Sequence, residues 1–193
     1  MTHDELKQLS AYSRYDGFYL AILWVASFAC LLYSSSLPIL GQFYTILLFS
    51  TPFFVAYRFK KFREEGRNGV ISFKRGLFYC LRVHFNAALI FSLLQWLYMN
   101  YVDNGRLLSI LTTVYSTPQA KQMFTTMNVS YNDIIRLLSM MTEPAVLAAN
   151  SFISAVVFGV FLSLIIAALM MKQVPSSNSK QYKSEHKQWI FPL

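Results

Sequence analysis

The sequence predicts an all-α, polytopic membrane protein with four transmembrane helices and short amphipathic helices in the outer connection between helices three and four. Hydrophobic residues make up 55% of the chain and charged residues only 13%, whereas a soluble domain carries about 25% charged residues. Residues 17–57 contain no charged side chain, although one spanning helix needs only about 20 apolar residues. The composition therefore indicates a chain folded largely in lipid.

The first two spans are expected over residues 17–35 and 39–57, after a polar cytoplasmic segment of residues 1–16. Pro38 follows a short serine-rich stretch, and proline disfavours helix in the residue before it, so the chain turns there. Pro52 lies inside the second span. It removes one backbone hydrogen bond and is predicted to kink that helix.

The third span is expected over residues 77–101, in a helix that Ser72 can cap at its N-terminus. Trp96, Tyr98 and Tyr101 lie near its far end. Aromatic residues of this kind gather at membrane surfaces, so this end is predicted to reach the outer interface.

The connection of residues 102–144 is less polar than an ordinary loop and is predicted to form an outer helical cap. Its leucines and isoleucines recur at helical spacing in two places, which predicts two short amphipathic helices lying on the bilayer or roofing the bundle. Ser130 and Asp133 have the form of a capping box before the second of these helices.

The last span is expected over residues 145–171, with Pro144 in its first turn and Lys172 after its end. A single four-helix transmembrane domain thus covers residues 17–172. Residues 173–193 are predicted to be a flexible cytoplasmic tail because they are polar and rich in serine and lysine.

The distribution of lysine and arginine predicts the orientation. With four spans, 14 of the 17 basic residues fall on the side of the two termini and the 58–76 connection. Arg106, Lys121 and Arg136 fall on the other side. Because positively charged loops stay in the cytoplasm, both termini are predicted to be cytoplasmic.

The 58–76 connection is the most basic part of the chain and is predicted to contact anionic lipid or a protein partner. Nucleic acid is not an expected partner, because nucleic-acid-binding proteins spread their basic residues over a water-facing surface. The predicted contact residues are Arg58, Lys60, Lys61, Arg63, Arg67, Lys74 and Arg75.

The third span is the most polar of the four. Polar residues inside a span are costly, so they face the protein interior or mark a functional path. A snorkelling role for Arg82 and a packing role for His84 are the plain alternatives to a path. The residues concerned are Arg82, His84, Asn86 and Gln95.

A small residue recurs at every fourth position of the last span, which predicts a stripe that packs closely against another helix. The stripe comprises Ser151, Ala155, Gly159, Ser163 and Ala167. The sequence leaves open whether its partner helix belongs to this chain, to a second copy or to another protein.

The sequence shows no set of residues typical of a catalytic or metal-binding site. No acidic residue lies within an apolar run, and no nucleophile is paired with a base. Cys30 and Cys80 lie inside apolar runs, which disfavours both a disulfide framework and a thiolate metal site. The chain is therefore expected to be non-enzymatic and to need no cofactor or metal.

The basic run, the segment 68–73 (NGVISF) after it and a last helix that ends at Lys172 resemble the bacterial inner-membrane family known as domain of unknown function 4199. The resemblance implies a four-span inner-membrane protein, and no catalytic residues, since the family has no assigned activity. Its members are often encoded near membrane glycosyltransferases, which implies a partnership. Lys74 and Arg75 depart from the pattern, as does the weakly acidic outer segment.

These observations lead to two functional hypotheses. The first is a non-catalytic subunit or scaffold of an inner-membrane complex, accessory to a membrane glycosyltransferase or an envelope assembly system, with a protein partner or self-association through the fourth helix. The alternative is a carrier or flippase for a lipid or lipid-linked substrate, with the polar residues of the third span as its path. An enzyme acting on lipid is a third and weaker hypothesis.

Overall fold

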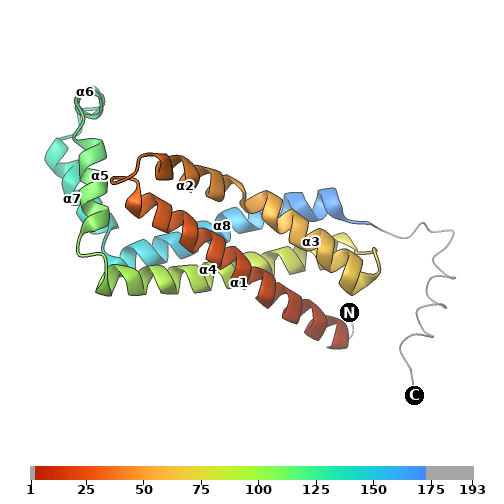
Figure 1. Ribbon diagram of the computed structural model, residues 1–193. Coiled ribbons are helices and arrows are strands. Elements are labelled where there is room, and N and C mark those ends of the chain that lie inside the picture. Colours follow the sequence, from red (N-terminus) through yellow and green to blue (C-terminus); the bar gives the residue numbers. More distant parts are fainter. Residues whose placement is uncertain (1–2, 173–193) are drawn as a thin grey trace, which may run out of the picture.

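Eight helices make up the computed structural model of this chain, which describes residues 3–172. The predicted tail of residues 173–193 lies outside the described residues. Three helices are long and apolar enough to cross a membrane: α1 (His3–Tyr33), α4 (Phe73–Tyr101) and α8 (Pro144–Met170). They run together along an elongated bundle (Figure 1).

The predicted second span is a bent pair of helices, α2 (Ile39–Phe49) and α3 (Thr51–Arg67). The two meet at an angle of 40°, and Pro52 lies in the first turn of α3. Because proline is compatible with the first turn of a helix but not with its interior, the break falls where Pro52 predicted a kink. The bundle thus has three spans, or up to four when the bent pair is one span.

The first helix extends further toward the N-terminus than the apolar run of residues 17–35. It begins at His3 and continues without a break through Asp16. Along this length Leu9, Leu20 and Trp24 are buried in the main core, with Val55 and Phe59 from α3. The polar beginning of the chain is therefore part of the helix bundle.

Polar contacts join the first helix to the bent pair. The indole nitrogen of Trp24 donates to Thr51 Oγ1 at 3.0 Å, and Ser27 Oγ donates to the Tyr44 carbonyl at 3.1 Å. Both bonds lie near the break between α2 and α3. They hold the kinked pair against α1 where its own backbone ladder is interrupted.

The connection between α4 and α8 contains three helices rather than the two predicted: α5 (Arg106–Tyr115), α6 (Pro118–Thr126) and α7 (Tyr131–Met141). α6 has no long apolar repeat, so helical spacing could not reveal it. Its beginning is fixed by Pro118 in the first turn and by Thr117, whose hydroxyl accepts from the Ala120 amide. Ser130 lies at the N-cap of α7 as predicted, but its side chain makes no capping bond within residues 3–172.

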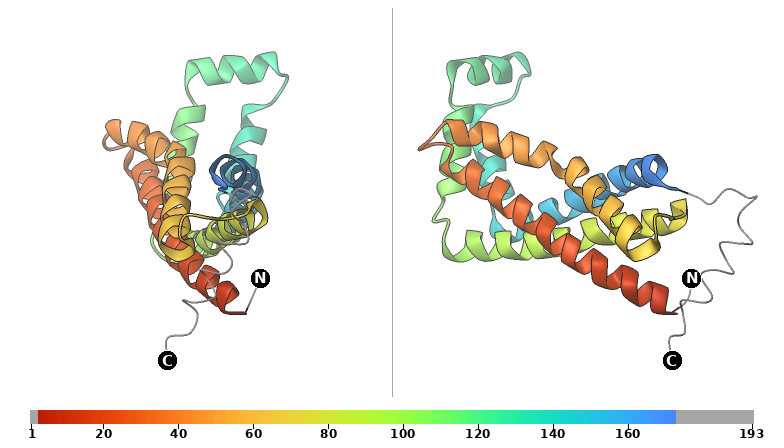
Figure 2. Two further views of the ribbon diagram at one scale, coloured as in Figure 1. Left: turned by 90° about the vertical axis from the view of Figure 1, so that its right-hand side faces the viewer. Right: turned by 45° about the vertical axis from the view of Figure 1, so that its right-hand side comes forward.

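These three helices form an arch at one end of the bundle. α5 and α7 stand across the bundle axis, and α6 links their far ends (Figures 1 and 2). Leu107 of α5 is buried with Leu32 and Met99 in a second, smaller core. The Arg106 guanidinium lies 4.3 Å from the centroid of the Tyr33 ring, which ties α5 to the end of α1.

Candidate functional site

The basic connection between α3 and α4 closes the opposite end of the bundle. Asn68 and Gly69 both have positive φ (49° and 81°), which turns the chain out of α3. Ile71 and Lys172 then exchange two backbone hydrogen bonds, of 2.9 and 3.1 Å. The end of α8 is thereby fixed to this connection, so the two lie at the same end of the molecule.

Arg63 strengthens the same junction. Its Nη1 donates to the Met170 carbonyl at 2.8 Å, and its Nη2 donates to Glu64 at 3.2 Å. Met170 is the last residue of α8, where carbonyl groups lack helical partners and the helix dipole favours a positive charge. Arg63 thus caps α8 from a neighbouring helix.

Arg58 forms an ion pair with Asp16 of α1, and Tyr79 of α4 donates a hydrogen bond to the same carboxylate. Asp16 is 1% exposed and Tyr79 is fully buried. The absence of acidic residues from the apolar runs did not predict this cluster. The sequence did contain a signal for this pair. Asp16 and Arg58 are the residues on either side of the charge-free stretch 17–57, and they meet when that stretch folds back as a helical hairpin.

A second ionic cluster lies nearer the end of the bundle. Glu5 of α1 accepts from Arg67 at 3.1 Å and from Arg75 at 2.8 Å. The three side chains are 26%, 15% and 33% exposed, respectively. This cluster joins α1, α3 and α4 within reach of water.

The predicted lipid-contact residues therefore divide by type. All four arginines of the 58–76 connection have polar partners inside the molecule. Among the three lysines, Lys61 lies 3.8 Å from Glu65, whereas Lys60 and Lys74 are exposed. Lys60 and Lys74 are thus the exposed members of the set.

The polar residues of α4 point in different directions. Asn86 faces α1, where its Nδ2 donates to the Ser13 carbonyl at 3.3 Å. Gln95 is buried toward the arch end of the helix, and its Oε1 has no hydrogen-bond partner among residues 3–172. The Arg82 guanidinium lies 5.1 Å from the centroid of the Phe78 ring. Asn86 therefore contacts α1, whereas Gln95 lies further along α4, toward the arch end.

His84 faces α8. Its Nδ1 lies 2.9 Å from the Cys80 carbonyl and 3.2 Å from Ser163 Oγ. A carbonyl can only accept, so the proton is assigned to Nδ1. Nε2 is then a bare acceptor, and it has no partner within the described part of the chain.

The pairing of Ser163 with His84 places a hydroxyl beside an imidazole, an arrangement that the sequence did not suggest. Ser163 is fully buried and His84 is 2% exposed. A nucleophile needs both an activating base and an approach for substrate. Because Nδ1 carries the proton, the nitrogen that faces Ser163 is a donor and not a base, and the pair makes a polar contact between α4 and α8.

The small-residue stripe of α8 packs against α4 over its second half. A Cβ on Gly159 would lie 2.7 Å from His84 Cβ, and Ala167 Cβ lies 3.7 Å from the position of a Cβ on Gly76. Gly159, Ser163 and Ala167 are buried, whereas Ser151 and Ala155 are half-buried. The stripe brings two helices of the same chain into close approach.

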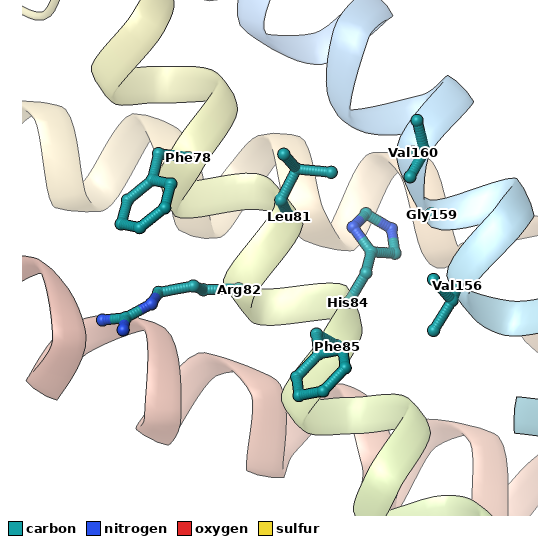
Figure 3. Close-up of a pocket in the computed structure, with 8 residues that line it drawn as sticks. All are labelled: Phe78, Leu81, Arg82, His84, Phe85, Val156, Gly159 and Val160. Atoms are coloured by element: carbon teal, nitrogen blue, oxygen red, sulfur yellow. The ribbon is translucent and has the colours of Figure 1, made fainter.

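A shallow groove of about 240 Å³ runs along the outer side of this α4–α8 contact (Figure 3). Its wall is almost wholly apolar. The lining residues are Phe78, Leu81, Arg82, His84, Phe85, Val156, Gly159 and Val160. Arg82 extends from α4 on the side away from α8, whereas His84 turns toward α8 (Figure 3).

Metal-binding groups are not clustered in the described structure. Residues 3–172 contain no group of three or more histidine, cysteine, aspartate or glutamate side chains placed to hold a metal ion. Cys30 and Cys80 are both free thiols.

Comparison with known proteins identifies the family of the chain. No curated protein and no solved structure matches it. One family model matches residues 15–172, from the middle of α1 to the residue that pairs with Ile71. The matched segment spans most of the chain, and the chain belongs to the family described as "Protein of unknown function (DUF4199)".

Proposed function

We propose that this protein is a non-catalytic integral membrane subunit, a scaffold within an inner-membrane complex of a bacterium. The partner system we propose is a membrane glycosyltransferase or an envelope assembly system. Both termini and the 58–76 connection face the cytoplasm, and the arch of α5, α6 and α7 faces outward. This orientation rests on the excess of lysine and arginine at the connection end.

The observation that carries the proposal is the exposed apolar surface of the arch. Val114, Met123 and Met127 are 58%, 48% and 63% exposed. α6 lies off to one side of the bundle, displaced across its long axis near the ends of α1 and α4 (Figure 2). Val114 belongs to α5, Met123 to α6, and Met127 follows the end of α6. Exposed apolar side chains of this kind are typical of a surface that another protein covers, and methionine adapts well to such contacts.

The polar interior supports a scaffold as well. Asp16, Arg58 and Tyr79 bind one another, and His84 contacts Ser163 across two helices. Polar groups that satisfy each other between helices fix the arrangement of those helices. A rigid bundle of this kind is suited to presenting the arch at a constant position above the membrane.

Purification from native membranes tests the scaffold proposal. The full chain is tagged, extracted in a mild detergent and analysed by mass spectrometry for proteins present in stoichiometric amount. We expect Met123→Asp/Met127→Asp to release such a partner, because charged side chains oppose burial in an apolar interface. Gln119→Asp/Gln122→Asp, which changes two exposed polar residues of α6, should retain it.

The scaffold proposal fails if the unaltered protein is recovered without any stoichiometric partner. If a partner is present but remains bound to the methionine variant, the arch is not the contact surface. In that case the surface must be sought on the spans or at the connection end. The two outcomes are distinguishable in one set of purifications.

The α4–α8 groove favours a second candidate, a carrier or flippase for a lipid or lipid-linked substrate. Arg82 and His84 both line this groove, although Asn86 is turned toward α1. A reconstituted lipid-transport assay tests this candidate with alanine at Arg82, His84 and Asn86. Transport that is unchanged in the triple variant would exclude the polar path.

A further inference from the structure

The groove between α4 and α8 has the shape of a site for one extended hydrocarbon chain. Phe78, Leu81 and Phe85 form its α4 wall, and Val156 and Val160 form its α8 wall (Figure 3). One turn of a peptide helix about 10 Å wide with a 5.4 Å pitch occupies about 400 Å³, which is more than the hollow of about 240 Å³. The groove therefore suits a chain thinner than a peptide helix.

Two positive charges lie along the groove without acidic partners. Among residues 3–172, neither Lys74 nor Arg82 forms an ion pair with a carboxylate. This separates them from Arg58, Arg67 and Arg75, whose charges are met by Asp16 or Glu5. Lys74 and Arg82 are thus the basic residues of α4 whose charges are not met by a carboxylate of residues 3–172.

The helical repeat places these charges beside the groove. At 3.6 residues per turn, Lys74 lies on the same face of α4 as Leu81 and Phe85, about 6 Å along the axis from Phe78. Lys74 is exposed, and it lies between the groove and the connection end of the bundle. Arg82 lines the groove itself. Lys74 therefore stands beyond the connection end of the groove, and Arg82 borders the groove from the side of α4 away from α8 (Figure 3).

We propose that this groove binds a phospholipid with an anionic headgroup. The phosphate lies near Lys74 and Arg82, and one acyl chain lies between Phe78, Phe85 and Val160. An ammonium and a guanidinium both bind phosphate oxygens well, and the apolar wall matches the acyl chain. The lipid belongs to the leaflet at the connection end of the bundle. The site depends neither on the scaffold proposal nor on lipid transport.

Native mass spectrometry of the full-length protein in detergent tests the proposal. The probes are phosphatidylglycerol and phosphatidylcholine of the same acyl composition, titrated separately. We expect phosphatidylglycerol to bind more tightly, and Lys74→Gln and Arg82→Gln each to weaken it about fivefold, the effect of one basic residue near an anionic surface. Binding of phosphatidylcholine should change little in these two variants.

A variant that fills the groove provides a second test of lipid binding. Val160→Trp changes an exposed residue of α8 that lines the groove, so the bundle core is not disturbed. It should reduce binding of both lipids, because it occupies the space of the acyl chain. The control is Arg136→Gln, which removes an exposed arginine from α7 at the opposite end of the molecule and should leave binding unchanged.

Three results would overturn the proposal. The first is equal binding of the two lipids to the unaltered protein. The second is unchanged phosphatidylglycerol binding in both glutamine variants. The third is an equal loss in Arg136→Gln, which would show general attraction of anionic lipid to a basic protein. If Val160→Trp is unfolded by its melting temperature, the glutamine variants still decide the question.

Discussion

Asp16 of α1 and Arg58 of α3 form a buried ion pair that joins the two ends of the charge-free stretch 17–57. Tyr79 of α4 donates a hydrogen bond to the same carboxylate, so three helices meet at the Asp16 side chain. The Asp16 side chain is 2% exposed and the Arg58 side chain 21% exposed. The Asp16 carboxylate has lost nearly all the water that would otherwise compensate its charge, so it depends on Arg58 and on the Tyr79 hydroxyl.

Replacing one member of this pair should strongly destabilise the bundle. We expect Arg58→Gln to lower the free energy of unfolding by about 3–5 kcal/mol, because Asp16 would remain buried and uncompensated. Denaturant titration of the purified protein in detergent measures the loss. Arg58→Gln/Asp16→Asn should be more stable than Arg58→Gln alone. The coupling would be contradicted if the double variant lost as much free energy of unfolding as Arg58→Gln and Asp16→Asn lose in total when measured singly.

The cluster of Glu5 with Arg67 and Arg75 should respond differently. Its side chains are 15–33% exposed, so water and salt screen their charges. We expect Glu5→Gln to cost about 1 kcal/mol or less at low salt, and less still at high salt. The same denaturant titration at two ionic strengths measures this. If Glu5→Gln lowered the free energy of unfolding as much as Arg58→Gln does, Glu5 would contribute as much as the Asp16–Arg58 pair to the stability of the bundle.

A helix could be predicted from the sequence wherever its own residues form a long apolar run or include a proline at its beginning. The long apolar runs predicted α1, α4 and α8, and Pro52 and Pro144 predicted the break before α3 and the beginning of α8. α6 was missed because it has no apolar repeat and depends on a local cap at Thr117. Periodicity reports which face of a helix is apolar, so it cannot reveal a helix that has no such face.

The polar contacts were harder to predict because they depend on how helices are placed against one another. In the sequence, Asp16 looks like the last polar residue before a span. It is buried in the structure because α1 continues through it and because α3 brings Arg58 beside it. His84 and Ser163 are 79 residues apart in the sequence and touch only because α8 lies against α4 at Gly159. Single-residue patterns indicate that such groups need partners but not which partners they find.

The close approach of α4 and α8 at Gly159 leads to a further prediction. A Cβ on Gly159 would lie 2.7 Å from His84 Cβ and 2.9 Å from His84 Cγ, closer than carbon atoms tolerate. We expect Gly159→Ala to destabilise the protein by about 1–3 kcal/mol, because no rotamer change moves His84 Cβ and the two helices must therefore separate. The melting temperature in detergent measures this effect.

Ser154→Ala is the matched control for Gly159→Ala. Ser154 lies on the exposed side of α8, so its replacement should change the melting temperature little. A melting temperature that is unaffected by Gly159→Ala would show that α4 and α8 are further apart than the structure has them. The small-residue stripe would then be free to pack on another chain.

The proposed orientation can be tested by labelling cysteines in intact cells. Cys30 and Cys80 are first replaced by alanine, and a single cysteine is then placed at Lys60 of α3 or at Gln119 of α6, both of which are exposed. Lysine and arginine are concentrated at the connection end, so this end should stay in the cytoplasm. A membrane-impermeant maleimide should therefore label Gln119→Cys in intact cells and Lys60→Cys only after lysis. The reverse pattern would place the arch in the cytoplasm, where its apolar surface would have to meet a cytoplasmic partner.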